Sequence, residues 1–153
     1  MTNNSYSLDT NLFLTAWNDT YRPASFPGFW RELEGLISSG RACSSEEVLR
    51  ELSKKDDGVY KWAKDQDQLS IKLEEEQIAL TRSLTKRFPV LAKERLGRMR
   101  ADAFVIALAQ WKGLTVVTAE NRRGAEKIPN LCEGAKVECI TLADLIEHEG
   151  WSF

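Results

Sequence analysis

The sequence predicts an α/β domain with three layers, in which helices cover both faces of a central, mainly parallel β-sheet. Short apolar strands alternate with helical segments along the chain, which favours parallel strands joined by crossover helices. Residues 114–118 form a continuous apolar and β-branched run, which indicates a strand covered on both faces. The chain contains no internal repeat and no Pro- or Gly-rich linker, so we expect one domain over residues 1–153.

The first strand is expected at residues 6–8. Asp9, Thr10 and Asn11 follow it, and these residue types favour turns and helix caps over continuation of a strand. The next elements expected are a helix at 12–17, an irregular aromatic stretch at 18–26, a helix at 27–37, a short strand at 41–43, a helix ending near residue 55 and further helical patterns at 59–88.

The second half of the chain contains the most apolar helix. Residues 103–111 are apolar on almost every face, which indicates a helix buried on several sides, and Gly113 ends it before the strand at 114–118. Residues 137–140 predict another strand, and residues 141–147 predict a closing helix. In a parallel sheet of this kind, sites form beyond the carboxyl ends of the strands.

Three bulk properties exclude several classes of function. The start of the chain lacks the basic and apolar regions of a signal peptide, and no apolar run could span a bilayer, so we expect a cytoplasmic protein without membrane contact. The three cysteines are odd in number and mostly far apart, which favours reduced thiols over a disulfide framework or zinc knuckle. His148 is the only histidine, which removes most histidine-based hydrolase and zinc mechanisms.

Any attraction to nucleic acid must be local, because the formal net charge is -2. Residues 82–100 carry seven basic residues against one acid, and Arg98 and Arg100 lie at the end of this run. We interpret the run as a candidate phosphate-binding surface, with a solvated helix face as the alternative. Arg122 is a further candidate for substrate contact, and its alternative is a solvated loop.

Four carboxylates could meet at the carboxyl edge of the sheet. Asp9 directly follows the first strand, and Glu120 lies two residues beyond the strand at 114–118. Asp102 stands at the start of the buried helix, where an ordinary N-cap is the alternative role. Glu51 completes the set from the helix that ends near residue 55.

Glu51 is chosen over its neighbours by its place on the helix. Ser44 and Glu47 have the spacing of a capping box, which would engage Glu47 in the helix start. Glu51 instead falls at the margin of the apolar stripe and could face a site. An ion pair with Lys54 or Lys55 is the alternative for Glu51.

A cluster of carboxylates predicts a metal ion. Neighbouring carboxylates repel one another unless a cation lies among them. Hard oxygen ligands without sulfur or imidazole select Mg²⁺ or Mn²⁺. The chemistry expected of such a centre is phosphodiester hydrolysis, in which the ion activates water and stabilises the leaving oxygen.

Four stretches of this sequence, taken in order, resemble the PIN-domain nucleases and more narrowly a bacterial PIN-like subfamily of uncharacterised function. They read YSLDTNLFL, FPGFWRELEGLISSGRACSSEEVLREL, ADAFVIALAQWKGLTVVTAE and KIPNLCEGAKVECITLADLI. The resemblance implies a single PIN-like domain over residues 1–153 with metal-dependent endoribonuclease activity. The acidic positions that match, as catalytic and metal-binding residues, are Asp9, Glu51, Asp102 and Glu120.

The resemblance also implies supporting residues and partners. Thr10, Asn11 and Thr118 fall where such domains have supporting side chains. Many PIN proteins of this size resemble VapC-type toxins, which implies an RNA substrate, a cognate antitoxin and a type II toxin–antitoxin pair, with a homodimer left open. Glu120 stands where Asp is usual in those toxins, which leaves open whether it contacts the metal directly.

Two other functions remain open from the sequence. A non-catalytic PIN-like module would bind nucleic acid or a protein through the basic stretch without cutting a substrate. A structure-specific DNA nuclease would use the same carboxylates, since no motif here recognises a 2′-hydroxyl group.

Overall fold

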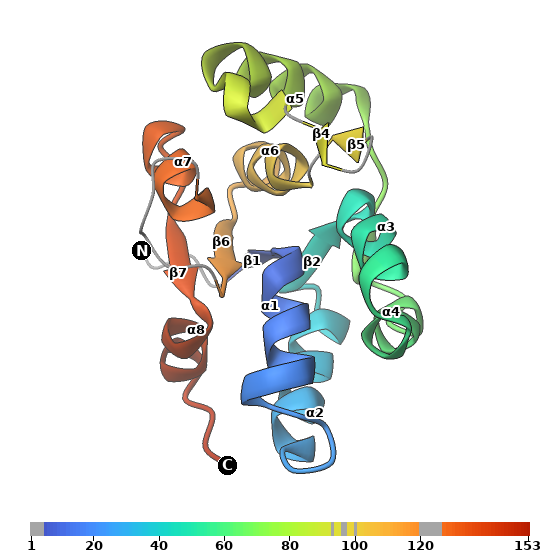
Figure 1. Ribbon diagram of the computed structural model, residues 1–153. Helices are drawn as coiled ribbons and strands as arrows, with labels where there is room; N and C mark the ends of the chain where they lie inside the picture. The colour runs from blue at the N-terminus through green and yellow to red at the C-terminus, as the bar shows by residue number, and fades with distance from the viewer. Residues whose placement is uncertain (1–4, 93, 96–97, 100, 120–126) are drawn as a thin grey trace.

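The described part of the chain forms the three-layer α/β/α fold that the sequence predicts (Figure 1). The structure is a computed structural model. Its description covers residues 5–92, 94–95, 98–99, 101–119 and 127–153.

The central sheet has five strands in the order β3-β2-β1-β6-β7, and every pairing within it is parallel. This order places β1 in the middle of the sheet. Its neighbours are β2, the next strand in the sequence, and β6, which follows only after β5. A separate antiparallel pair, β4-β5, lies outside this sheet. The strands are β1 (Tyr6–Leu8), β2 (Ala42–Ser45), β3 (Ser70–Ile71), β4 (Glu94–Arg95), β5 (Arg98–Met99), β6 (Thr115–Thr118) and β7 (Cys139–Thr141).

Helices cover both faces of the sheet (Figure 1). On one face, α6 lies against β1, β2 and β6, and α5 packs on its outer side. On the other face lie α1, α2 and α8, while α3 packs beside β2 and β3 and α4 packs against α3. The helices are α1 (Thr10–Thr15), α2 (Pro27–Ser38), α3 (Glu46–Lys55), α4 (Asp57–Lys64), α5 (Glu75–Arg87), α6 (Asp102–Lys112), α7 (Ile128–Gly134) and α8 (Leu142–Glu149), with the short turns η1 (Ala16–Thr20) and η2 (Pro89–Ala92).

Helix α6 and strand β6 form the centre of the hydrophobic core, as the apolar pattern predicts. Val105, Ile106 and Leu108 of α6 are fully buried, and β6 is buried along its whole length. Gly113 ends the helix in the left-handed conformation at φ 66°, which glycine adopts at little cost. A helix apolar on every side is stable here because it is covered by the sheet on one side and by α5 on the other.

Three local predictions differ from the structure. The segment 59–88, where only helical patterns are predicted, also contains the two-residue strand β3, whose pairing with β2 is not visible in a local pattern. Part of the stretch predicted to be irregular forms the π-helical turn η1. The predicted capping box is wrong: Ser45, not Ser44, is the N-cap of α3, and its side chain accepts a hydrogen bond from the Glu47 N–H at 3.2 Å.

The aromatic residues that follow α1 form a packed cluster instead of an open loop. The Tyr21 ring stacks on Phe29 with centroids 4.7 Å apart, and Trp30 lies 5.1 Å from Trp17. Trp30 also packs edge-on against Trp62, so the cluster joins η1, α2 and α4. Within the described residues, no helix is long and apolar enough to cross a membrane.

Candidate active site at the carboxyl edge of the sheet

Asp9 lies where the sequence places it, directly after β1. It is the N-cap of α1, with an extended backbone at φ -81° and ψ 155°, and it is only 2% exposed. Its Oδ1 accepts a hydrogen bond from the Thr10 N–H at 2.8 Å, and its Oδ2 accepts one from the Thr118 hydroxyl at 2.7 Å. Both carboxylate oxygens are therefore held in fixed positions in a buried environment.

The register of the sheet explains the contact between Asp9 and Thr118. In the parallel pair β1-β6, Leu8 is the partner of Val117, so the next residues of both strands come side by side. The Asp9 N–H donates to the Val117 carbonyl at 3.0 Å, which continues the ladder to the edge. Thr118, which the sequence predicts as a supporting residue, donates its hydroxyl to the Asp9 carboxylate in this arrangement.

Asp102 is the first residue of α6 and is 9% exposed. The amino end of a helix favours a negative charge, because its free N–H groups and dipole point at that position. Ala101 occupies the N-cap position, so Asp102 does not have the ordinary cap role considered for it.

Cys132 of α7 lies close enough to both aspartates to be affected by their charges. A hydrogen bond with Cys139, burial, and the charges of Cys139, Asp9 and Asp102 all raise the pKa of the Cys132 thiol. Helix α6 ends just before the start of β6, and its Val105 carbonyl accepts a hydrogen bond from Ser7 of β1, so its first residue, Asp102, lies on the same carboxyl side of the sheet as Asp9. Cys132 is not among the site residues predicted from the sequence, which indicates only that the three cysteines are reduced thiols.

Glu51 reaches the start of α6 from helix α3. Its Oε2 accepts a hydrogen bond from the Ala101 N–H at 2.9 Å. This contact, and not a pairing with Lys54 or Lys55, is the one that the structure gives to the Glu51 carboxylate. Glu51 and Asp102 are consequently neighbours at one helix end.

Thr10 and Asn11 follow Asp9 in the first turn of α1. Thr10 is 3% exposed, and its hydroxyl oxygen is buried without a hydrogen-bond partner. Buried hydroxyl groups are nearly always hydrogen-bonded, so this oxygen beside Asp9 has an unused position for a partner such as a water or an ion. Asn11 is half-buried.

The donor set at this edge fits a hard divalent cation. The described residues contribute the Asp9 and Asp102 carboxylates and the free Thr10 hydroxyl, all oxygen donors. Within the described part of the chain, no three acidic, histidine or cysteine side chains lie close enough to hold a metal ion by themselves. Mg²⁺ commonly uses one or two carboxylates together with waters and substrate phosphates, so two aspartates suffice as the protein's share.

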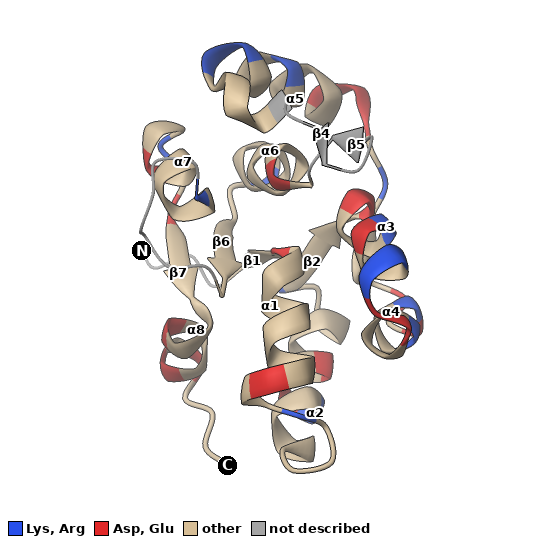
Figure 2. Cartoon of the chain, viewed as in Figure 1, with Lys and Arg blue, Asp and Glu red and all other residues tan. Residues whose placement is uncertain are grey.

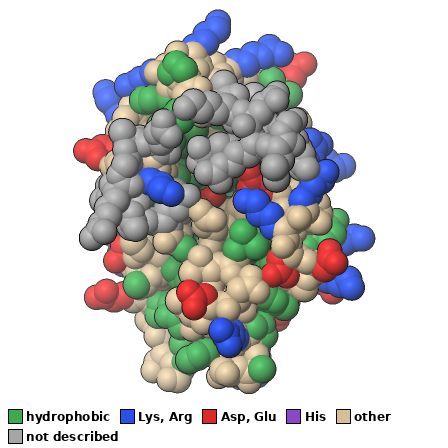
Figure 3. Space-filling model, viewed as in Figure 1, with side chains coloured by type: hydrophobic (Ala, Val, Ile, Leu, Met, Phe, Trp, Pro, Cys, Tyr) green, Lys and Arg blue, Asp and Glu red, His purple; other side chains and the backbone are tan. Residues whose placement is uncertain are grey.

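Several predicted site residues lie outside the described residues. These are Glu120, Arg100 and Arg122, while for Arg98 only the backbone, in β5, is described. Figure 2 marks several Lys and Arg positions on the ribbon of α5, α3 and α4, and the space-filling view in Figure 3 shows Lys and Arg side chains on the surface of the same regions. On α5 the exposed basic residues are Arg82, Lys86 and Arg87.

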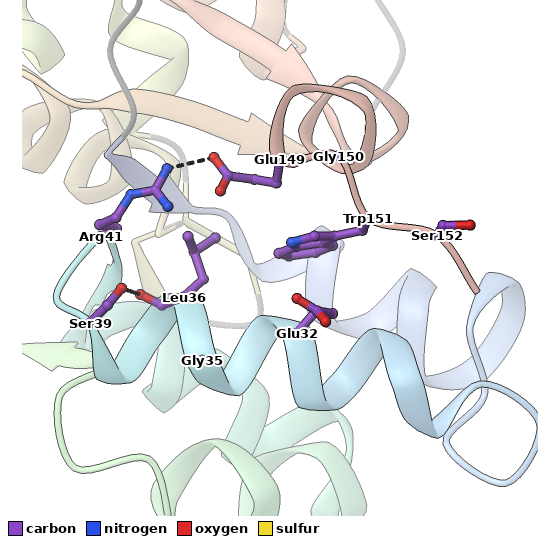
Figure 4. A pocket seen from close by; sticks show the side chains of 9 residues that line it. All are labelled: Glu32, Gly35, Leu36, Ser39, Arg41, Glu149, Gly150, Trp151 and Ser152. Atoms are coloured by element: carbon purple, nitrogen blue, oxygen red, sulfur yellow. Dashed lines mark hydrogen bonds and ion pairs between the residues drawn. The ribbon is translucent and has the colours of Figure 1, made fainter.

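A cavity of about 560 Å³ lies at the opposite, amino-terminal edge of the strands (Figure 4). Arg41, just before β2, forms a 2.6 Å ion pair with Glu149 at the end of α8. The hydroxyl of Tyr6 donates to the same Glu149 oxygen at 2.6 Å. The Glu149 carboxylate therefore links the end of α8 to the sheet through both contacts. Because these polar groups bind one another, we assign the cavity a structural role. It is lined by Glu32, Gly35, Leu36, Ser39, Arg41, Glu149, Gly150, Trp151 and Ser152.

Chains of similar fold occur in solved structures, of which three are described here. One is a chain of VapBC2 from Rickettsia felis, solved bound to a DNA fragment from the VapBC2 promoter. It is 21% identical to the present sequence with a TM-score of 0.56, and the alignment covers 89% of the present chain and 97% of the VapBC2 chain. A chain of DNA-bound VapBC from Salmonella typhimurium is 20% identical with a TM-score of 0.56, covering 90% and 97%. A chain of FitAcB from Neisseria gonorrhoeae is 18% identical with a TM-score of 0.52, covering 88% and 96%.

These similarities define the chain as a protein of VapC-like PIN fold, as the sequence resemblance predicted. Residues 6–153 match the model of a family described as a domain of unknown function, DUF4411, and the chain belongs to that family. No curated protein is significantly similar to it in sequence.

Proposed function

We propose that this protein is a metal-dependent endoribonuclease and the toxin of a type II toxin–antitoxin pair. The observation that carries the proposal is the buried Asp9 carboxylate, held at the carboxyl edge of β1 by Thr118, with Asp102 at the start of α6 on the same side of the sheet. The fold supports it, because the similar chains come from VapBC and FitAcB structures. A cytoplasmic location is part of the same proposal.

In this proposal Asp9 and Asp102 hold Mg²⁺ or Mn²⁺, with Glu120 as a further acidic ligand. A bound ion supplies Lewis-acid activation of the phosphate and lowers the pKa of an attacking water. The Thr118 hydroxyl fixes the direction of the Asp9 carboxylate, and the Thr10 hydroxyl is available as an additional oxygen donor. Both aspartates are nearly buried, which keeps bulk water from competing for their oxygens.

Basic side chains are proposed to hold the RNA backbone. Arg98, Arg100 and Arg122 are the residues proposed to contact phosphates, since charge of this kind supplies most sequence-independent affinity for nucleic acid. This contact predicts a binding affinity that falls steeply with salt.

We propose an antitoxin partner because the structures that contain chains of similar fold are VapBC and FitAcB structures. A cognate antitoxin would be encoded beside the gene, and it would bind and silence the nuclease. Co-expression with an adjacent small open reading frame should yield a stable complex without ribonuclease activity. If no adjacent product binds the protein, the toxin role is refuted while the nuclease proposal still stands.

The central experiment compares purified wild-type protein with Asp9→Asn on labelled RNA in the presence of Mn²⁺. We expect the wild type to cut RNA in a reaction that EDTA stops, and Asp9→Asn to leave it intact because the negative ligand is lost. Asp65→Asn, at an exposed site on the end of α4, is the matched control and should cut normally.

The same assay separates the other functions left open by the sequence. Equal cutting by wild type and Asp9→Asn would refute the carboxylate mechanism. RNA retention that survives EDTA without product would favour a non-catalytic module, and cutting of DNA but not RNA would favour a DNA nuclease. Mn²⁺ should also raise the Tm of the wild type but not of Asp9→Asn, because a ligand stabilises only the state that binds it.

A further inference from the structure

The first turn of helix α6 carries Asp102 but lacks a cap of its own. Ala101 occupies the N-cap position, and no side chain within the helix start accepts its hydrogen bonds. The Ala101 N–H is instead bound by Glu51, which comes from α3 fifty residues earlier in the chain. The α6 terminus is thus capped by a carboxylate supplied from another element.

A second hydrogen bond holds the same helical turn from the side of the sheet. The hydroxyl of Ser7 in β1 donates to the Val105 carbonyl at 3.0 Å, and Ser7 is completely buried. Asp102 lies between the two anchored positions, and Asp9 lies two residues after Ser7. The separation of the two aspartates therefore depends on how α6 is tied to α3 and to β1.

We propose that Glu51 is a positioning residue that fixes Asp102 relative to Asp9 through the Ala101 amide, and that it does not coordinate the metal itself. The expected effects on RNA cleavage rest on the proposed function, whereas the role of Glu51 at the helix end does not. One Glu51 oxygen is committed to a backbone N–H at 2.9 Å. A carboxylate at this helix end is favoured by the helix dipole without any cation.

A pair of substitutions separates positioning from coordination. Glu51→Gln keeps an oxygen that accepts the Ala101 hydrogen bond but removes the negative charge that a metal ligand needs. We expect its Mn²⁺ affinity, measured from the free Mn²⁺ signal in electron paramagnetic resonance, and its cleavage rate to stay within about threefold of wild type. Glu51→Ala removes the acceptor and should lower the rate about 10- to 100-fold, the usual cost of losing an outer-shell partner.

Glu46 offers a matched control on the same helix. Its Oε1 accepts a hydrogen bond from the Leu73 N–H at 3.0 Å, so Glu46→Ala also removes a carboxylate that anchors another segment. We expect Glu46→Ala to lower stability while leaving Mn²⁺ affinity and cleavage unchanged. Equal losses of activity in Glu46→Ala and Glu51→Ala would mean that general destabilisation explains the effect, which overturns the positioning role.

Amide hydrogen exchange tests the link independently of activity. In wild type and Glu51→Gln the Ala101 amide should exchange slowly, and in Glu51→Ala it should exchange rapidly. Loss of Mn²⁺ affinity in Glu51→Gln to the level of Asp9→Asn would identify Glu51 as a ligand and overturn the inference, as would unchanged Ala101 exchange in Glu51→Ala. If wild type cuts no RNA, the proposed function fails, while the exchange and Mn²⁺ measurements still decide the role of Glu51.

Discussion

The hydrogen bond from Thr118 to Asp9 gives the sharpest stability prediction. Thr118→Val replaces the hydroxyl with a methyl group of similar size and leaves Asp9 Oδ2 without its 2.7 Å donor. Thr118 is 1% exposed and Asp9 is 2% exposed, so water cannot readily replace the lost partner. Hydrogen bonds to charged groups contribute about 1.5–3 kcal/mol, and we expect the free energy of unfolding to fall by this amount.

Urea denaturation of Thr118→Val beside a control on the same strand measures this loss. Thr115 is equally buried, but its hydroxyl donates to Glu138 at 3.3 Å, a longer bond to an exposed partner. Thr115→Val should therefore cost less than Thr118→Val. For a domain of this size, the loss at Thr118 corresponds to a fall in Tm of about 3–12 °C. The reasoning is refuted if the two variants lose equal stability.

Three further predictions concern other titratable groups. Burial would raise the pKa of Glu149, but hydrogen bonds from Arg41 and Tyr6 outweigh it and lower that pKa. The stabilisation is then present above the unfolded pKa and lost in acid, so Arg41→Met should destabilise the protein near neutral pH and much less near about pH 3 in urea titrations. Burial and the hydrogen bond to Glu149 raise the pKa of Tyr6 from 10.0 to about 12, so the tyrosinate absorbance should show one late step that Tyr6→Phe removes, and wild-type stability should decline as the pH rises from 10 towards 12. The pKa of Cys132 is raised by its hydrogen bond with Cys139 and by burial, so a thiol reagent should modify the half-buried Cys139 first and Cys132 only on unfolding; early labelling of Cys132 would contradict its placement.

The sequence was sufficient for features that depend on local pattern. Asp9 was predictable because a short apolar strand ends in residues that favour helix caps, and the structure gives it that cap role. The buried α6 and the covered strand β6 were predictable from continuous apolar runs. These patterns reflect burial, which composition along the chain reports directly.

The features that depend on tertiary contacts were not predictable in the same way. The capping box failed by one position because the Ser44 hydroxyl is used by the sheet, where it donates to the Leu8 carbonyl at 2.9 Å. The partner of Glu51 is an amide fifty residues away, which no helix-face argument can identify. Ser7 was passed over although a polar residue inside a fully buried strand is itself a signal that its hydroxyl has a specific partner.

The central position of β1 has a consequence for synthesis of the protein. During synthesis Asp9 leaves the ribosome well before its hydrogen-bond donor Thr118, which follows 109 residues later. The strand pairing that brings them together is equally remote in sequence, and contacts of such separation form late because a long loop must close first. The candidate site at Asp9 therefore cannot assemble in a nascent chain until β6 has been synthesised. Whatever chemistry this edge performs, it begins only after β6 has been synthesised and has paired with β1.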